Sequence, residues 1–259
     1  MNLHPESSGA SPPLLLIPGW GMHCGIWERM AEQLALRFRV HCVDFPGYSN
    51  DHVVCPYDLD GLVHWFSDRW DSEYPGEPLA LCGWSLGGLV ALRWAHLVPH
   101  QVNKLVLIAT TPSFVQRRGW EYAMPVATLD EFSVSFLENP EQTLKRFIAM
   151  QALGSENERR VLKDLRDHLC DSRQPNIAAL REGLSILRDT DLRMLLPQIT
   201  HSSLVIAGES DVLAVPAASV FLAQQLPNAQ LFNIDGASHV PFLSHPDSVI
   251  QRMEVFLNG

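Results

Sequence analysis

The chain has 259 residues, a length that suits one large α/β domain or one such domain carrying a smaller insertion. Hydrophobic residues make up 46% and charged residues 19%, and the formal net charge of −10 argues against general nucleic-acid binding. The odd number of cysteines, five without a CxxC pair, favours neither a disulfide framework nor a zinc site.

The amino-terminal segment shows no basic start followed by a long apolar run, so no signal peptide is expected. The longest early apolar stretch, Leu14–Ile17, is far too short to span a bilayer. Only about a dozen residues precede Leu14, so any β-hairpin before it is expected to be short or missing. A cytoplasmic protein that acts away from membranes, and by default a monomer, is expected.

Six short apolar runs are predicted to be β-strands, and most have Val, Ile or Leu at successive positions, as in parallel sheets covered on both faces. Stretches with apolar residues three and four apart lie between them and are typical of helices. This alternation predicts right-handed crossovers and a doubly wound, mostly parallel α/β sheet. The expected strands are Leu14–Ile17, Arg39–Asp44, Leu79–Gly83, Lys104–Ala109, Ser203–Gly208 and Gln230–Ile234, and the helices are Ile26–Leu36, Leu59–Trp70, Leu86–His96, Ala217–Leu226 and Pro246–Phe256.

The alternation breaks between Pro112 and Pro197, where no strand-like run of comparable strength occurs. This stretch has nearly equal numbers of basic and acidic residues, whereas its flanks are strongly acidic, a difference that suggests separate roles. We therefore expect residues 1–112 and 197–259 to form the core and residues 113–196 to form a helical cap at the carboxyl ends of the strands, where open α/β sheets bind ligands. Its expected helices are Glu141–Gln151, Glu156–Leu169 and Asn176–Leu187.

A candidate nucleophile, Ser85, lies in Gly83-Trp84-Ser85-Leu86-Gly87, a GxSxG motif between a strand-like and a helix-like run. The glycines at 83 and 87 permit a sharp turn in which side chains would collide. Such a turn lifts the serine hydroxyl to a helix amino terminus, whose dipole favours developing negative charge. The alternative is a simple helix N-cap serine, which the strand–turn–helix setting disfavours.

Serine is a poor nucleophile unless a base takes its proton. Asp211 and His239 each follow a predicted strand, in the order serine, acid, histidine that this motif requires. We assign Ser85 as the nucleophile, His239 as the general base and Asp211 as the carboxylate that orients the imidazole. Alternative acids are Asp235 and Glu209, and His245 is an alternative base.

A negative oxygen formed by attack on a carbonyl also needs hydrogen-bond donors. One is expected to be the backbone N–H of Leu86, the residue after the nucleophile. The second is expected from the loop Ile17–Gly21, whose glycines allow close backbone approach, with the Trp20 N–H as the candidate. A packing role for the Trp20 side chain is compatible with this assignment.

Several motifs appear in the order seen in α/β-hydrolases: Pro18-Gly19-Trp20-Gly21, Asp44–Tyr48, Gly83–Gly88, Gly208–Asp211 and Ala237–His239. Three further features are more specific: Trp84 before the serine, the segment Arg146–Gly154, and Ser244-His245-Pro246 after the histidine. Together they resemble the pimeloyl-[acyl-carrier protein] methyl ester esterases of biotin synthesis over nearly the whole chain.

That resemblance implies an α/β-hydrolase fold and a serine carboxylesterase that cleaves a pimeloyl methyl ester carried on acyl carrier protein. It implies substrate contacts from Trp20, Ser85, Leu86, Phe147, Ile148, Ala149, Met150, Gln151 and His239. It also implies that Arg146, Arg159 and Lys163 hold the acidic carrier. Two departures stand out: Gln142 lies where another basic residue is expected, and Pro18 replaces a histidine that many relatives carry.

The residues themselves leave other interpretations of the cap open. Arg159, Lys163 and Arg166 share one face of a helix, but interleaved acidic residues also fit a solvated surface. The apolar side chains of Phe147, Met150, Trp120 and Met124 could line a channel for a methylene chain or simply pack the cap on the core.

No metal or organic cofactor is expected, because no ligand cluster or phosphate-binding glycine loop is visible. A short-chain esterase, a lactonase, a carbon–carbon bond hydrolase and a non-catalytic binding protein are the alternative functions.

Overall fold

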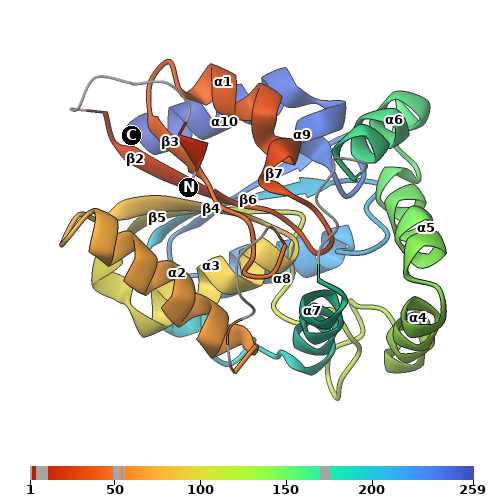
Figure 1. Ribbon diagram of the computed structural model, residues 1–259. Coiled ribbons are helices and arrows are strands. Elements are labelled where there is room, and N and C mark those ends of the chain that lie inside the picture. The colour runs from red at the N-terminus through yellow and green to blue at the C-terminus, as the bar shows by residue number, and fades with distance from the viewer. Residues whose placement is uncertain (1, 4–10, 49–53, 55, 170–175) are drawn as a thin grey trace.

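The computed structural model describes residues 2–3, 11–48, 54, 56–169 and 176–259 (Figure 1). A seven-stranded sheet runs through the middle in the order β1-β3-β2-β4-β5-β6-β7. All neighbouring strands pair in parallel except β1, which lies antiparallel to β3 at one edge. The bounds are β1 Asn2–Leu3, β2 Pro13–Ile17, β3 Arg39–Cys42, β4 Leu79–Trp84, β5 Val102–Ile108, β6 Ser202–Gly208 and β7 Ala229–Ile234.

Helices cover both faces of this sheet (Figure 1). On one face lie α1 (Glu28–Leu34), α9 (Pro241–Ser244) and α10 (Pro246–Asn258), and on the other lie α2 (Leu59–Glu73), α3 (Leu86–Leu97) and α8 (Pro216–Gln225). Short 3-10 turns occur at Cys24–Trp27, Pro99–Gln101 and Leu196–Gln198. The predicted doubly wound α/β fold is confirmed, and β1 adds a two-residue strand that was not among the expected elements.

The buried strands show why consecutive apolar residues predicted them. Successive side chains of a strand point to opposite faces of the sheet. In β2, Leu14 and Leu16 belong to the apolar cluster under α1 and α10, whereas Leu15 belongs to the cluster under α2 and α3. In β4, Leu81 and Cys82 divide between the same two clusters. Both faces are therefore dry, and every position of these strands must be apolar or small.

Between β5 and β6 the chain forms a group of helices beside the carboxyl ends of the strands, at the right of Figure 1. They are α4 (Val126–Glu138), α5 (Pro140–Ala152), α6 (Glu158–Leu169) and α7 (Ile177–Asp189). We call residues 113–196 the insertion, following the proposed division of the chain. The helix α4 was not among the expected elements, although it buries Leu129 and Phe136.

Two of the five cysteines, Cys55 and Cys170, lie outside the described residues, as do residues 4–10 of the amino-terminal segment. The side chains of Cys42 and Cys82 are buried, and burial raises the pKa of both thiols. In the part of the chain that is described, no helix is both long and apolar enough to cross a membrane.

Candidate active site

Ser85 lies at a sharp turn between β4 and α3. Its φ is 55°, in the left-handed region that an L side chain rarely adopts. The turn is tight because a Cβ on Gly83 would collide with the Gly87 backbone, and one on Gly87 would collide with the Ile17 carbonyl. The Ser85 N–H donates to the Ile108 carbonyl at 3.0 Å, and the Ser85 carbonyl accepts from the Thr110 hydroxyl at 2.8 Å. These bonds from the end of β5 hold the unusual backbone in place.

A line of hydrogen bonds joins the three predicted catalytic side chains. Nε2 of His239 lies 3.0 Å from Oγ of Ser85, and Nδ1 of His239 lies 2.9 Å from Oδ2 of Asp211. All three residues are less than 5% exposed. Oδ1 of Asp211 accepts the backbone N–H groups of Leu213 and Ala214 at 2.8 and 3.0 Å, so the carboxylate is fixed on both sides. An ionised carboxylate only accepts hydrogen bonds, so Nδ1 carries the proton and Nε2 is left to accept from the serine.

The topology brings these side chains together. Asp211 follows β6 and His239 follows β7, and the two strands are parallel neighbours in register from Ser203 to Gly208. Their carboxyl ends therefore lie next to each other, on the side of the sheet where β4 also ends. A Cβ on Gly208 would collide with the Ser238 carbonyl, so the two loops are closely packed.

The rival residues lie elsewhere. Asp235 and Glu209 are exposed, and the Glu209 carboxylate accepts the Gly236 N–H at 3.4 Å. Nε2 of His245 lies 3.9 Å from Oε2 of Glu156, in the insertion. None of the three contacts Ser85 or His239 through a hydrogen bond among the described residues.

A hydrogen bond to the Tyr48 hydroxyl holds the loop that follows β2. Tyr48 is fully buried, burial raises the pKa of its hydroxyl, and the neutral oxygen accepts the Gly21 N–H at 3.2 Å. Among the hydrogen bonds between described residues, none uses the backbone N–H of Trp20 or of Leu86. The Trp20 indole instead donates to the Leu180 carbonyl of α7 at 2.8 Å. Its ring lies edge-on to those of Phe132, Phe136 and Phe147, so the side chain packs against the insertion.

A cavity of about 240 Å³ opens onto Ser85 and His239. Its wall is mostly apolar, and no Lys or Arg is among its lining residues. The lining residues are Ser85, Phe114, Met124, Thr128, Leu129, Glu131, Phe132, Ser135, Phe147, Met150, Leu184, Leu187, Leu213 and His239. A neutral, flexible chain therefore suits this cavity better than an anionic one.

The predicted substrate-contact segment divides over the faces of α5. Phe147 and Met150 line the cavity, as does Met124 from the segment before α4. Ile148 is buried in the cluster under α1 and α10, Ala149 is exposed, and Gln151 is completely buried. Trp120 packs against Tyr122 and Phe221, away from the cavity lining.

Sequence reasoning missed the wall that α4 and α7 supply. Leu129 and Phe132 come from α4, and Leu184 and Leu187 come from α7. The signal was present in α7, whose apolar residues recur at three- and four-residue spacing, but it says only that one face is buried and not what it faces.

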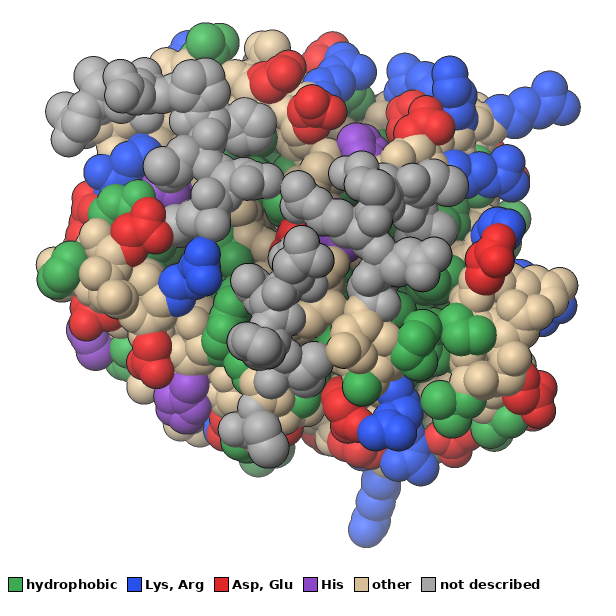
Figure 2. All heavy atoms as spheres, in the orientation of Figure 1, with side chains coloured by type: hydrophobic (Ala, Val, Ile, Leu, Met, Phe, Trp, Pro, Cys, Tyr) green, Lys and Arg blue, Asp and Glu red, His purple; other side chains and the backbone are tan. Residues whose placement is uncertain are grey.

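The predicted carrier contacts Arg146, Arg159 and Lys163 are exposed, the first on α5 and the others on α6. Lys and Arg side chains gather at the α6 end of the molecule, with acidic side chains between them, at the upper right of Figure 2. Gln142 is exposed on the first turn of α5. Within the described residues, no group of three or more His, Cys, Asp or Glu side chains is arranged to hold a metal ion.

Comparison with known proteins supplies the remaining findings. Residues 12–246 match the family model described as the alpha/beta hydrolase fold. A protein of Nitrosomonas europaea named pimeloyl-[acyl-carrier protein] methyl ester esterase is 39% identical over 249 residues, 96% of this chain and 97% of that protein. Proteins of the same name from Nitrosospira multiformis and Aeromonas hydrophila are 37% and 35% identical, over 99% of this chain in both cases and 98% and 100% of theirs.

Solved structures agree on the fold. An esterase from Exiguobacterium antarcticum superposes with a TM-score of 0.89 at 22% identity, over 97% of this chain and 94% of that one. The enol-lactonase from Burkholderia xenovorans superposes with a TM-score of 0.85 at 21% identity, over 100% of this chain and 95% of that one. Enzymes with different substrates thus share this architecture.

Proposed function

The chain belongs to the α/β-hydrolase family and, within it, to the pimeloyl-[acyl-carrier protein] methyl ester esterases, and from this premise we propose that it hydrolyses the methyl ester of a pimeloyl chain carried on acyl carrier protein. It is a carboxylic ester hydrolase in this proposal, with Ser85 as its nucleophile. The observation that carries the proposal is the buried hydrogen-bonded line from Asp211 through His239 to Ser85.

The proposed first step is attack by Ser85 on the ester carbonyl. Nε2 of His239 takes the hydroxyl proton as the new C–O bond forms, and Asp211 stabilises the resulting imidazolium. The backbone N–H groups of Trp20 and Leu86 hold the negative oxygen of the tetrahedral intermediate. Collapse of the intermediate expels methanol, which receives the proton from His239, and leaves the acyl chain on Ser85.

Hydrolysis of the acyl-enzyme repeats these steps with water. His239 takes a proton from the water as it attacks the carbonyl, and then returns it to Oγ of Ser85. The product is a free carboxylate at the far end of the carrier-bound chain. Because the cavity is lined mostly by apolar side chains and by no Lys or Arg, it favours the neutral ester over this anionic product, which supports release.

The cavity also fits the proposed acyl chain. Its wall is built from leucine, phenylalanine and methionine side chains, and each methylene that they bury contributes about 0.8 kcal/mol. Phe147 and Met150 are the members that the sequence resemblance implied. The exposed Arg146, Arg159 and Lys163 are proposed to attract the acidic carrier, since opposite charge at an interface favours encounter and orientation. A cytoplasmic location and a monomeric state remain predictions of the sequence.

The test is methanol release from purified pimeloyl-[acyl-carrier protein] methyl ester. We expect turnover by the wild-type protein and none by Ser85→Ala, which lacks only one oxygen atom. The wild-type gene, but not Ser85→Ala, should also restore growth of a biotin-requiring strain that lacks this esterase. Turnover of free methyl esters with no gain from the carrier would instead favour a short-chain esterase. A wild-type protein that neither hydrolyses esters nor reacts with a fluorophosphonate at Ser85 would point to a binding protein.

A further inference from the structure

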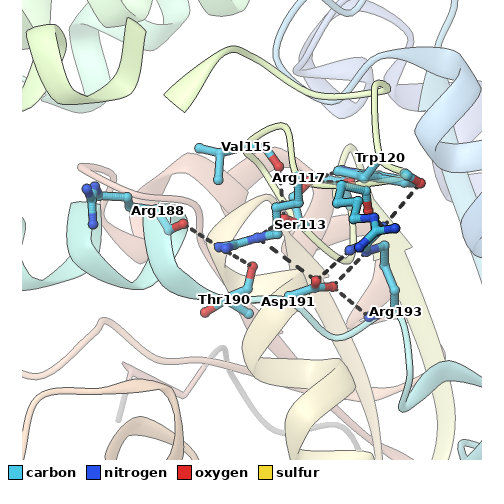
Figure 3. A network of polar contacts seen from close by, with 11 residues as sticks. Ser113, Val115, Arg117, Trp120, Arg188, Thr190, Asp191 and Arg193 are labelled. Carbon is cyan, nitrogen blue, oxygen red and sulfur yellow. Dashed lines mark hydrogen bonds and ion pairs between the residues drawn. The ribbon is translucent and has the colours of Figure 1, made fainter. Parts of the chain in front are cut away.

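The two ends of the insertion meet in a network of polar contacts that includes none of the catalytic side chains (Figure 3). The chain enters the insertion through residues 113–124, which we call the base hairpin because bridges pair Val115 with Met124 and Arg117 with Trp120. It leaves through residues 188–193, which run from the last turn of α7 into the segment that follows it. The Leu192 N–H donates to the Pro112 carbonyl at 2.9 Å, so the two strands of chain lie side by side.

Arg117 makes the central contacts of this network. Its Nη2 donates to the carbonyls of Arg188 at 2.6 Å and Thr190 at 3.4 Å, and its Nε donates to the Ser113 hydroxyl at 3.1 Å. The last carbonyls of a helix have no partner within it, and a positive charge there complements the helix dipole. Arg117 from the base hairpin therefore caps the carboxyl end of α7.

Asp191 and Arg193 reinforce the same junction. The Arg193 guanidinium donates to both carboxylate oxygens of Asp191, at 2.9 and 2.8 Å, and these bonds hold the Asp191 pKa below its ordinary value. The remaining nitrogen of Arg193 donates to the Gly119 carbonyl at 3.2 Å, in the turn of the base hairpin. Nε of Arg117 lies 4.0 Å from Oδ2 of Asp191, which closes the network.

The elements joined in this way carry two parts of the cavity wall. Phe114 and Met124 come from the base hairpin, and Leu184 and Leu187 come from the end of α7 that Arg117 caps. The backbone N–H of Met124 donates to the Phe114 carbonyl at 3.3 Å, so these two lining residues move with the hairpin. We propose that Arg117 is a positioning residue that fixes the separation of these two walls and thereby sets the affinity of the cavity for longer acyl chains.

This inference deepens the proposed function and rests on it, since it assumes that the cavity receives the acyl group. Arg117 does not line the cavity or contact the catalytic side chains, so its loss should spare the reaction at the carbonyl. A chain that ends before the walls of the base hairpin and α7 should be unaffected, whereas a longer chain should bind less well.

The kinetic test compares p-nitrophenyl acetate with p-nitrophenyl hexanoate. Arg117→Met keeps an unbranched apolar stem but removes the guanidinium group, with its donors and its charge. We expect KM for the hexanoate to rise about tenfold, a loss of about 1.4 kcal/mol of binding free energy, which is the size of the contribution of a single hydrogen bond. The value of kcat, and both constants for the acetate, should stay unchanged. Arg117→Lys, which keeps the charge, should restore part of the hexanoate affinity.

The matched control is Arg118→Met, since Arg118 is the exposed neighbour in the same hairpin and its side chain makes no hydrogen bond or ion pair among those of the described residues. It should behave like the wild type with both esters. An equal loss for acetate and hexanoate in a folded Arg117→Met protein would overturn the proposal, as would an unchanged preference for the longer chain.

A second measurement separates this inference from the catalytic one. In a Ser85→Ala background, the heat of binding of methyl heptanoate measures the affinity of the cavity for an ester that is not hydrolysed. Adding Arg117→Met should weaken this binding by about tenfold, whereas adding Arg118→Met should not. If the wild type hydrolyses no ester but this difference in binding is found, only the proposed function fails. If esters are hydrolysed and the difference is absent, only the role of Arg117 fails. Should Arg117→Met not fold, Arg117→Lys and Asp191→Asn in the same background test the same prediction.

Discussion

The catalytic line and the insertion are held in place by different kinds of interaction. Ser85, Asp211 and His239 are buried, joined by hydrogen bonds, and follow the carboxyl ends of β4, β6 and β7. On the insertion, ion pairs such as Lys145–Glu141 and Arg188–Asp130 join exposed side chains, and such pairs contribute little to stability. The position of the insertion therefore depends on apolar packing and on the junction at its base. This difference implies that the core sets the rate at the carbonyl and the insertion selects the acyl group.

The largest expected effect tests the core. Asp211→Asn leaves the shape of the site intact but cannot fix the imidazole tautomer that accepts the serine proton, so kcat should fall about 10⁴-fold. The fall should be the same for p-nitrophenyl acetate and hexanoate, because Asp211 touches His239 and not the acyl chain. Steady-state kinetics with the two esters measure it.

The matched control is Asp235→Asn, because Asp235 is the exposed rival carboxylate on the loop that carries His239. It should retain wild-type kcat. If kcat of the Asp211→Asn protein falls by different factors for the two esters, the core does not set the rate independently of the acyl group.

Acid should weaken the core through His41. This residue of β3 is completely buried against the rings of Trp70 and Tyr74, and burial, with the nearby Arg39 charge, lowers its pKa to about 4. In the unfolded chain the same group takes up its proton near pH 6.5. Between these values the unfolded state binds more protons, so stability falls as the pH falls from about 6.5 to about 4. The His41 contribution to this fall is about 3 kcal/mol, since each unit of pKa corresponds to about 1.4 kcal/mol.

The measurement is the free energy of unfolding in urea at a series of pH values. His41→Phe should flatten its decline between pH 6.5 and 4, whereas the exposed His100→Gln should not. In the insertion, by contrast, hydrogen bonds from Arg193 lower the pKa of Asp191, so its ion pairs should persist over the same range. An equal decline in the His41→Phe protein would show that acid acts on another part of the molecule.

The difference between core and insertion also explains which features could be predicted from the sequence. Runs such as Leu14–Ile17 and Leu79–Gly83 predicted their strands because burial on both faces leaves no alternative to apolar side chains. Ser85, Asp211 and His239 could be assigned because each follows a predicted strand, and the carboxyl ends of parallel strands lie on the same side of a sheet. The wall of the cavity could not be derived in this way. It comes from helices whose relative positions depend on contacts between residues far apart in the chain, such as Arg117 with Thr190.

The insertion also contains features that the local pattern of apolar residues does not predict. The helix α4 follows Pro125 and contains several serine and β-branched residues, so its intrinsic helix preference is weak. It is stabilised instead by burial of Leu129 and Phe136, which the sequence alone does not place. The five-residue segment from Phe147 to Gln151 was expected to contact substrate as a unit, yet successive residues of a helix point in different directions, so only Phe147 and Met150 line the cavity.

A smaller effect should follow from Trp84, which joins the core loops to one another. Its indole donates to the His239 carbonyl at 2.8 Å, and a Cβ on Gly19 would lie 3.0 Å from its ring. Trp84→Phe removes the donor and part of the ring, so the histidine loop loses a fixed position relative to Ser85. We expect kcat to fall about tenfold for short and long esters alike, the cost of one buried carbonyl left without its partner.

The control is Trp94→Phe in α3, which also removes one buried hydrogen bond, to Gln101 at 2.9 Å, but lies away from the site. Both variants should lose stability, and only Trp84→Phe should lose kcat. Equal kcat values in the two proteins would make Trp84 a packing residue only.

The smallest expected effect tests the outer face of the insertion. Lys163 is exposed on α6, where a carrier is proposed to bind, and it makes no contact with the cavity. Lys163→Glu reverses one charge at the rim of such an interface, which should raise KM for the carrier-bound ester about threefold at low salt and leave kcat unchanged. The effect should shrink as salt screens the charges, and KM for p-nitrophenyl hexanoate should not change. Arg29→Glu makes the same charge change on α1, outside the proposed interface on α5 and α6, and should leave both substrates unaffected. If Arg29→Glu raises KM for the carrier-bound ester as much as Lys163→Glu does, overall charge and not the α6 surface attracts the carrier. The insertion would then contribute to substrate selection only through the residues that line the cavity.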